Sequence, residues 1–248
     1  MNFSQVWREI RIVYQPIYDL DSGNVPGFEA LARGPDGSLR SPNNLFRIAA
    51  REGILTKAEM FCFQLAVEKS SPLPGMIFYN FSPSTVISQC HEIIECLKYV
   101  REKAVIELIE YALPEKTRCE LIRAVGELQA NGLKVALDDV GNGDRNFSDI
   151  SEIPANFMKI DRRIIRGLTK HRSGNAPRYQ IILHTMVKLA RMLNMQIIAE
   201  GVETEMQLSG VQRAGIKLAQ GFHLARPQPA EYWVINGSRC LAGYAGGC

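Results

Sequence analysis

The sequence predicts an α/β fold, a barrel of eight strands in which one strand is antiparallel to the others. Short apolar runs alternate with longer segments of helical pattern along the whole chain, which is typical of a parallel sheet covered by helices. Only the six residues Asp19–Asn24 separate the first two apolar runs, too few for a crossover helix. Those two runs therefore predict an antiparallel hairpin, and the eight runs together predict a TIM-like (β/α)8 barrel with one antiparallel strand.

The length and composition permit one large core. At 248 residues and 46% apolar, the chain is long enough for one or two domains, and a single α/β barrel is a common outcome at this size. We find no internal repeat and no low-complexity linker. We therefore expect a single domain over residues 1–235, followed by a flexible Gly-rich tail over residues 236–248.

Composition also argues against several classes of protein. The 29 basic and 26 acidic residues give a net charge of +3, too balanced to indicate a nucleic-acid polymer as partner. The six cysteines show neither CxxC nor zinc-ligand spacing with histidine, which favours reduced thiols. No run approaches the roughly 18 apolar residues of a membrane span, and the N-terminus lacks a signal-peptide pattern. We therefore expect a cytoplasmic protein without direct membrane insertion.

Eight short apolar runs give the predicted strands. They are Ile12–Tyr18, Val25–Arg33, Met76–Phe81, Ala104–Ile109, Leu133–Asp139, Phe157–Ile160, Gln196–Glu200 and Leu218–Leu224. After the hairpin formed by the first two, each strand is separated from the next by a longer stretch that predicts a crossover helix.

Residues typical of helix ends support these helices. Ser41-Pro42 and Ser82-Pro83 each place a capping residue before a proline at the first helical position. A helix over Pro114–Asn131 is expected to stop at Gly132, which suits a left-handed C-terminal conformation. The segment Thr204–Gly215 predicts another helix, with a capping threonine before it and a glutamate in its first turn.

Two adjacent carboxylates give the strongest local indication of function. Asp138 and Asp139 stand where a buried apolar run ends, and the triplet Gly141-Asn142-Gly143 follows. Burying two acids that repel each other is costly unless a cation offsets their charge. Aspartate is also common in ordinary turns at strand ends, so this motif alone leaves both interpretations open.

The other predicted strands also end in polar residues. These residues are Glu29, Asn80, Glu107, Lys159, Glu200 and Gln220. In a barrel such strand ends meet at one rim. With the paired aspartates they form an oxygen-rich set that favours Mg²⁺ or Mn²⁺ over zinc. Each residue alone has an ordinary explanation, such as an ion pair between Glu29 and Arg33 or a helix cap from Asn80, but their coincidence at one rim predicts a metal centre.

An acid cluster around two cations is suited to attack by water on a phosphodiester, because the metals hold the attacking and leaving oxygens. A lysine beside the cluster, such as Lys159, can orient the water, and an arginine such as Arg33 can grip a phosphate with two hydrogen bonds. The residues alone are therefore suited to metal-dependent attack of water on a phosphodiester, and they leave the substrate open.

Eight motifs follow one another along nearly the whole chain. They are YQPI at Tyr14–Ile17, FEALAR at Phe28–Arg33, NFS at Asn80–Ser82, ELIE at Glu107–Glu110, DDVGNG at Asp138–Gly143, KID at Lys159–Asp161, AEGVET at Ala199–Thr204 and QGF at Gln220–Phe222. In this order they resemble the EAL-domain family, phosphodiesterases that hydrolyse the bacterial second messenger cyclic di-GMP. Each motif alone is weak, whereas all eight in the family's order are highly specific. The resemblance also implies a barrel with one antiparallel strand.

The resemblance implies a role for each matching residue. Glu29, Asn80, Glu107 and Asp138 would hold one Mg²⁺ or Mn²⁺ ion, and Asp138, Asp139 and Glu200 would hold a second. Lys159 would engage the hydrolytic water, so that Lys159, Glu200 and Glu29 are the candidate catalytic residues. Gln15, Leu31, Arg33 and Gln220 match the family's substrate contacts. Glu110 matches an acid that steadies the loop after the paired aspartates, and Glu203 matches a supporting residue next to the site.

The sequence departs from the family in the loop Val140–Phe147. Family members usually have DDFGTGYSSL where this chain has DDVGNGDRNF, and Ile109 stands where threonine is usual. In the family this loop couples metal binding to dimer contacts. Two functions therefore stay open: a homodimeric phosphodiesterase that converts cyclic di-GMP to linear pGpG, or a catalytically weak module that binds cyclic di-GMP or a protein partner.

Overall fold

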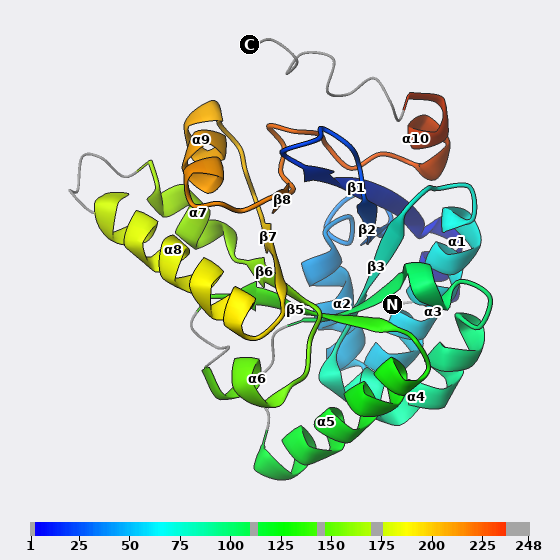
Figure 1. The fold of residues 1–248 in the computed structure, drawn as a ribbon. Helices are drawn as coiled ribbons and strands as arrows, with labels where there is room; N and C mark the ends of the chain where they lie inside the picture. The colour runs from blue at the N-terminus through cyan, green and yellow to red at the C-terminus, as the bar shows by residue number, and fades with distance from the viewer. Residues whose placement is uncertain (1–2, 110–113, 143–146, 170–175, 237–248) are drawn as a thin grey trace.

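Eight strands close into a barrel in the order β1 to β8, with helices packed around it (Figure 1). The structure is a computed structural model that describes residues 3–109, 114–142, 147–169 and 176–236. The strands are β1 (Arg11–Asp19), β2 (Gly27–Arg33), β3 (Met76–Phe81), β4 (Ala104–Leu108), β5 (Lys134–Val140), β6 (Phe157–Ile160), β7 (Gln196–Ala199) and β8 (Leu218–Ala219).

β1 is the antiparallel strand. It pairs antiparallel with β2 on one side and with β8 on the other, and every other neighbouring pair is parallel. The hairpin register places Gln15 opposite Glu29 and Arg11 opposite Arg33. The hairpin and the barrel predicted from the six-residue connection are therefore confirmed.

The described helices are α1 (Phe3–Glu9), α2 (Pro42–Arg51), α3 (Leu55–Ser70), α4 (Pro83–Cys96), α5 (Glu115–Ala130), α6 (Phe147–Glu152), α7 (Arg162–Gly167), α8 (Ala176–Met192), α9 (Glu205–Arg213) and α10 (Ala230–Asn236), with a 3₁₀ turn at Arg101–Lys103. Among the described residues, no helix combines the length and the apolar character that a membrane crossing requires.

The predicted helix ends are confirmed in position. Ser41 and Ser82 occupy the N-cap positions of α2 and α4, although neither side chain accepts a capping hydrogen bond. Gly132 follows α5 with φ +85°, where a side chain would be strained. Thr204 forms a reciprocal capping box with Gln207 at the start of α9.

An apolar layer fills one part of the barrel and supports the polar site. A cluster of Ile17, Phe78, Val105, Ala136, Phe157 and Ile198 is separate from the main core between strands and helices. Because alternate residues of a strand share a face, the residue two positions further along each parallel strand points to the same interior. Those residues are Asn80, Glu107, Asp138, Lys159 and Glu200. The barrel interior thus changes from apolar to polar over two residues of each parallel strand.

The predicted end of the eighth strand is wrong, and several other predicted strand ends differ from the structure by one or two residues. The eighth strand was expected to reach Leu224, but β8 ends at Ala219, because the apolar run beyond it forms a turn in which Leu224 N–H donates to the Gly221 carbonyl. Glu200 lies one residue beyond the end of β7. Residues 237–248 of the predicted tail lie outside the described residues, and the domain boundary at residue 235 stays a prediction.

Candidate active site

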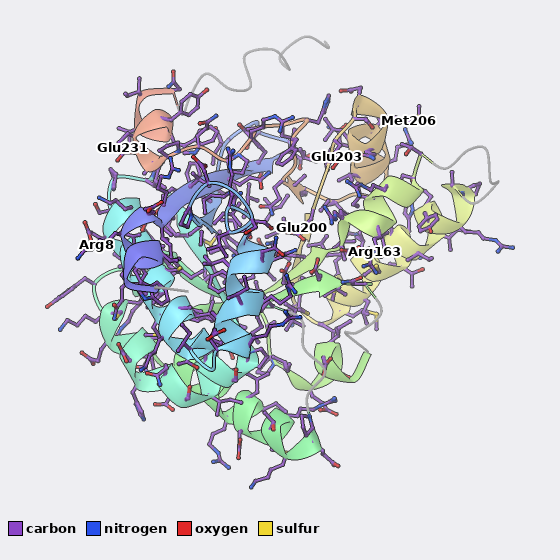
Figure 2. All side chains as sticks on the ribbon, turned by 180° about the vertical axis from the view of Figure 1, so that it is seen from behind. Arg8, Arg163, Glu200, Glu203, Met206 and Glu231 are labelled. Atoms are coloured by element: carbon purple, nitrogen blue, oxygen red, sulfur yellow. The ribbon has the colours of Figure 1, made fainter. Side chains whose placement is uncertain are left out.

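Five carboxylates, which we call the acid cluster, meet at the carboxyl-terminal rim of the barrel. They are Glu29 on β2, Glu107 on β4, Asp138 and Asp139 on β5, and Glu200 after β7. Carboxylate oxygens of Glu29, Glu107 and Glu200 lie within 4.8 Å of one another, as do those of Asp138, Asp139 and Glu200. In Figure 2, Glu200 lies near the middle of the molecule, whereas Arg8 and Glu231 lie at its edge. The structure therefore brings all five predicted acids together.

Lys159 lies inside the acid cluster. Its side chain is fully buried, and its Nζ lies 2.5 Å from Glu107, 2.7 Å from Glu200, 3.2 Å from Glu29 and 3.7 Å from Asp138. Burial lowers the pKa of an ammonium, but the four carboxylates, Glu107 first among them, raise the pKa of Lys159 well above its ordinary value. Lys159 is therefore the charged internal counter-ion of the cluster.

One ammonium does not offset the whole charge of the acid cluster. Burial raises the pKa of Glu107 and Glu200 well above the ordinary value, and Lys159 only partly opposes this rise. Burial also acts to raise the pKa of Glu29, but Lys159 and hydrogen bonds from Asn80 and Gln220 bring it below the ordinary value. The cluster thus carries more acids than its one lysine can keep ionised.

Two amides, one on β3 and one directly after β8, donate hydrogen bonds to the acid cluster. Asn80 Nδ2 donates to Glu29 Oε1 at 3.0 Å, which means that its side chain serves the site and does not cap α4. Gln220 Nε2 donates to Glu29 at 2.6 Å and to Glu200 at 2.8 Å. Both predicted residues therefore lie in contact with the predicted metal ligands.

The donor set fits a hard dication. The acid cluster offers carboxylate oxygens, and Asn80 offers an amide oxygen. Mg²⁺ and Mn²⁺ prefer oxygen ligands of these kinds. The Oε2 atom of Glu107 is buried and has no hydrogen-bond partner within the described part of the chain. A buried carboxylate oxygen without a donor is costly, and a cation ligated by it would remove that cost.

Asp139 differs from its neighbour in backbone and in ionisation. Its φ of +52° is in the left-handed region, which aspartate and asparagine tolerate better than most side chains. Burial, the charge of Asp138 and contact with Asp161 raise the pKa of Asp139 from 3.8 to about 7, with Lys159 opposing. Without a cation, Asp139 is therefore partly protonated at neutral pH.

This raised pKa predicts how the stability of the metal-free chain depends on pH. An acid with a raised pKa in the folded state stabilises the fold below its unfolded pKa and loses that contribution as the pH rises to about 7. We expect the melting temperature in EDTA to fall from pH 5 to pH 8 more steeply for the wild type than for Asp139→Asn, which keeps the shape and the left-handed backbone. Equal slopes in the two proteins would contradict the assignment.

Two cavities open beside the acid cluster. One of about 200 Å³ is lined by Gln15, Glu200, Glu203 and Gln220. A larger one of about 530 Å³ is lined by Leu31 together with Glu29, Asn80 and the paired aspartates. Three of the four predicted substrate contacts, Gln15, Leu31 and Gln220, therefore border the space next to the predicted metal ligands.

The remaining predicted residues are Arg33, Glu203 and Glu110. Arg33 lines a different cavity and, among the described residues, forms no ion pair with Glu29, so the ordinary ion-pair explanation for these two residues is wrong. Glu203 pairs with Arg166 on α7 at 2.7 Å. Glu110 and residues 143–146 of the divergent loop lie outside the described residues, so the role of Glu110 stays a prediction.

Sequence reasoning missed Glu59, which supports the site from α3. This buried carboxylate accepts hydrogen bonds from the backbone N–H and the hydroxyl of Ser82, at 2.8 Å for the hydroxyl. It thereby fixes the end of β3, which carries Asn80. The only signal in the sequence was an acid among the apolar residues of α3.

Two curated relatives each match most of the chain. PdeG of Escherichia coli K12, a probable cyclic di-GMP phosphodiesterase, is 30% identical over 233 residues, which is 88% of this chain and 45% of PdeG. MucR of Pseudomonas aeruginosa, a bifunctional diguanylate cyclase and cyclic di-GMP phosphodiesterase, is 27% identical over 92% of this chain and 34% of MucR. The chain thus spans less than half the length of these relatives.

Solved structures share the fold. The MucR phosphodiesterase in complex with cyclic di-GMP superposes with a TM-score of 0.80 at 26% identity, over 93% of this chain and 97% of that one. BlrP1 of Klebsiella pneumoniae, solved with manganese and cyclic di-GMP, has a TM-score of 0.76 at 23% identity, over 90% and 57% of the two chains. The EAL domain model matches residues 6–227. With that match over most of its length, and with the barrel and the acid cluster in place, the chain belongs to the EAL domain family.

Proposed function

We propose that this chain hydrolyses cyclic di-GMP to linear pGpG in a reaction that depends on two Mg²⁺ or Mn²⁺ ions. The observation that carries the proposal is the convergence of five carboxylates, from four separate segments, around one buried lysine. The substrate is supported by the description of PdeG and by the cyclic di-GMP complex of MucR. The metal is supported by the oxygen-rich donor set and by the manganese complex of BlrP1.

The proposed ligands divide into two sets that share Asp138. Glu29, Asn80, Glu107 and Asp138 would hold one ion, and Asp138, Asp139 and Glu200 would hold the other. When bound, the two dications would hold the attacking and leaving oxygens of the phosphodiester and offset the charge that develops there. Glu200 also lies within 4.8 Å of Glu29 and Glu107, so it joins the two sets.

The protein's own groups orient the reactants. Lys159 donates to Glu107 and lies 2.7 Å from Glu200, so its ammonium is fixed where it can orient a water and offset negative charge. Gln220 holds Glu29 and Glu200 in place through its amide. Gln15 and Leu31, on the walls of the adjoining cavities, would position the nucleotide.

Arg33 is expected to act in substrate binding more than in the chemical step. Its guanidinium is half-buried at the end of β2 and donates to the Ala32 carbonyl at 2.9 Å, which leaves further donors for a phosphate. Because a charge-assisted hydrogen bond contributes about 1.5–3 kcal/mol, Arg33→Ala should raise KM roughly 10- to 100-fold with little change in kcat. Steady-state kinetics with cyclic di-GMP measures this, with the exposed Arg213→Ala as control. A fall in kcat at unchanged KM would argue against the role.

The direct test is to incubate the chain with cyclic di-GMP and either Mg²⁺ or Mn²⁺ and to separate the products by chromatography. Formation of pGpG that stops with EDTA is the expected result. Binding of cyclic di-GMP without turnover under either metal would overturn the hydrolase and favour the receptor module that the divergent loop Val140–Phe147 leaves open.

We further infer, from the family resemblance, that the domain acts in the cytoplasm as a homodimer. Light scattering of the purified chain, with and without Mn²⁺, measures its oligomeric state, and a monomer under both conditions would contradict the dimer.

A further inference from the structure

The short helix α7 contacts the two segments that carry the ligands proposed for the second dication. We call residues 138–142, at the end of β5, the β5 segment, and residues 200–204, after β7, the β7 segment. α7 directly follows β6, and β6 pairs with β5 on one side and with β7 on the other. In Figure 2, Arg163 of α7 lies in the same part of the molecule as Glu200 and Glu203. The helix is thus placed to fix one ligand segment relative to the other.

α7 approaches a glycine closely in each segment. Gly141 has φ +99°, and a Cβ atom at this position would lie 2.4 Å from Cδ1 of Ile164 on α7. Gly201 has φ +63°, and its Cβ atom would lie 2.5 Å from Cβ of Arg162. Both positions favour glycine, through the positive φ and through the close approach of the helix. α7 is therefore packed directly against the backbone of both segments.

Two arginines of α7 add a polar contact to each segment. Arg163 Nη1 donates to the Asn142 carbonyl at 3.0 Å, and Arg166 Nη2 donates to Glu203 Oε1 at 2.7 Å. The Asn142 N–H in turn donates to the Asp139 carbonyl at 3.1 Å. The left-handed backbone of Asp139 persists only where its surroundings hold it. The guanidinium of Arg163 supplies part of that support, because it fixes the turn that closes on Asp139.

We propose that Arg163 is a positioning residue for the second dication, which it serves by holding Asp139 in place relative to Glu200. In this role it touches neither the ion nor the substrate. Asp139 belongs only to the ligand set of the second ion, whereas Asp138 is shared, so the effect of Arg163 should fall mainly on one ion. The inference rests on the proposed function, because the two ligand sets are those of the proposed phosphodiesterase.

The charge of Arg163 and its position in the fold predict opposite effects on metal binding. A positive charge on α7 repels a nearby dication, so an arginine that acted only through its charge would weaken metal binding, and its removal would strengthen it. An arginine that holds the backbone does the reverse, because its removal lets Asp139 leave the conformation that the ion requires. The sign of the change in affinity therefore separates the two roles.

Titration of the metal-free chain with Mn²⁺, with the free ion followed by electron paramagnetic resonance, tests the proposal without turnover. We expect two ions to bind the wild type and one of them to bind Arg163→Ala about tenfold more weakly, at the lower end of the loss typical of an outer partner of a metal ligand. Arg163→Lys keeps the charge and a donor and should bind both ions nearly as tightly as the wild type. Arg213→Ala removes an exposed arginine from α9 and is the matched control, which should bind like the wild type.

Hydrogen exchange in EDTA measures the same role without metal. The backbone amides of the β5 segment should exchange about fivefold faster in Arg163→Ala than in the wild type, because one hydrogen bond to this turn is lost, whereas those of β4 should be unchanged. Arg163→Lys should exchange like the wild type.

Three results would overturn the proposal. They are Mn²⁺ binding to Arg163→Ala that is as tight as in the wild type or tighter, an equal loss of affinity at both ions, and unchanged exchange in the β5 segment. Because neither measurement involves cyclic di-GMP, a wild type that forms no pGpG contradicts the proposed hydrolysis and leaves the role of Arg163 to be decided by these results. An active wild type with unchanged Mn²⁺ binding in Arg163→Ala contradicts only the role of Arg163.

Discussion

Glu29→Ala is expected to abolish hydrolysis of cyclic di-GMP with either Mg²⁺ or Mn²⁺. The side chain of Glu29 is buried, lies 3.2 Å from Lys159 and accepts hydrogen bonds from Asn80 and Gln220. Its removal takes away one proposed metal ligand and one of the acceptors of each of the two amides. The loss in kcat should exceed the roughly 10- to 100-fold effect of removing an outer partner of a metal ligand. Product chromatography over a long incubation measures it.

Two controls separate loss of a ligand from loss of the fold. Glu29→Gln keeps the volume and an acceptor oxygen but removes the charge, and we expect it to unfold at nearly the wild-type temperature in EDTA while losing most turnover. Glu68→Ala removes an exposed glutamate from α3 and should keep the full rate. If Glu29→Ala turned over at the wild-type rate with metal present, the assignment of Glu29 as a ligand would be wrong.

The barrel was predictable because local chemistry determines it. The six residues between β1 and β2 permit only a hairpin, and the parallel strands bring polar residues to one rim by their alternation alone. The convergence of Glu29, Glu107 and Glu200 follows directly from this topology. The predicted end of the eighth strand was wrong. The apolar residues after Ala219 belong to a turn, and an apolar pattern does not show whether such a segment continues as a strand or turns.

Features that depend on contacts between distant parts of the chain were harder to predict from the sequence. Lys159 was expected beside the acid cluster, but it lies within the cluster. The sequence could not predict this position of the ammonium, because it depends on the arrangement of four separate segments. Arg33 lines a different cavity from Leu31, which is two residues earlier. The sequence did not predict this, because neither the strand end nor the motif determines the direction of a long side chain. Glu59 was missed because its partner Ser82 had a simpler local interpretation as a helix cap.

Lys159→Met is expected to make the stability of the chain depend on dications. The raised pKa of Lys159 means that its stabilising contribution is fully present at neutral pH and is lost only as the pH rises through that raised value. Removing it leaves the carboxylates of Glu29, Glu107 and Glu200 without a cation, and breaking such a buried pair costs about 3–5 kcal/mol. In EDTA the variant should therefore unfold at a much lower temperature than the wild type.

The size of that loss should change with pH and with metal. The pKa values of Glu107 and Glu200 are raised in the folded state, so at low pH these acids are protonated and the missing ammonium matters less; the loss should grow as the pH rises. Mn²⁺ should restore most of the stability but not turnover, because the ion replaces the charge of Lys159 and not its role toward the water. Lys217→Met, which removes an exposed ion pair with Asp21, is the control. If Lys159→Met were destabilised equally with and without Mn²⁺, the lysine and the metal would not neutralise the same carboxylates. That result would contradict the proposed metal centre.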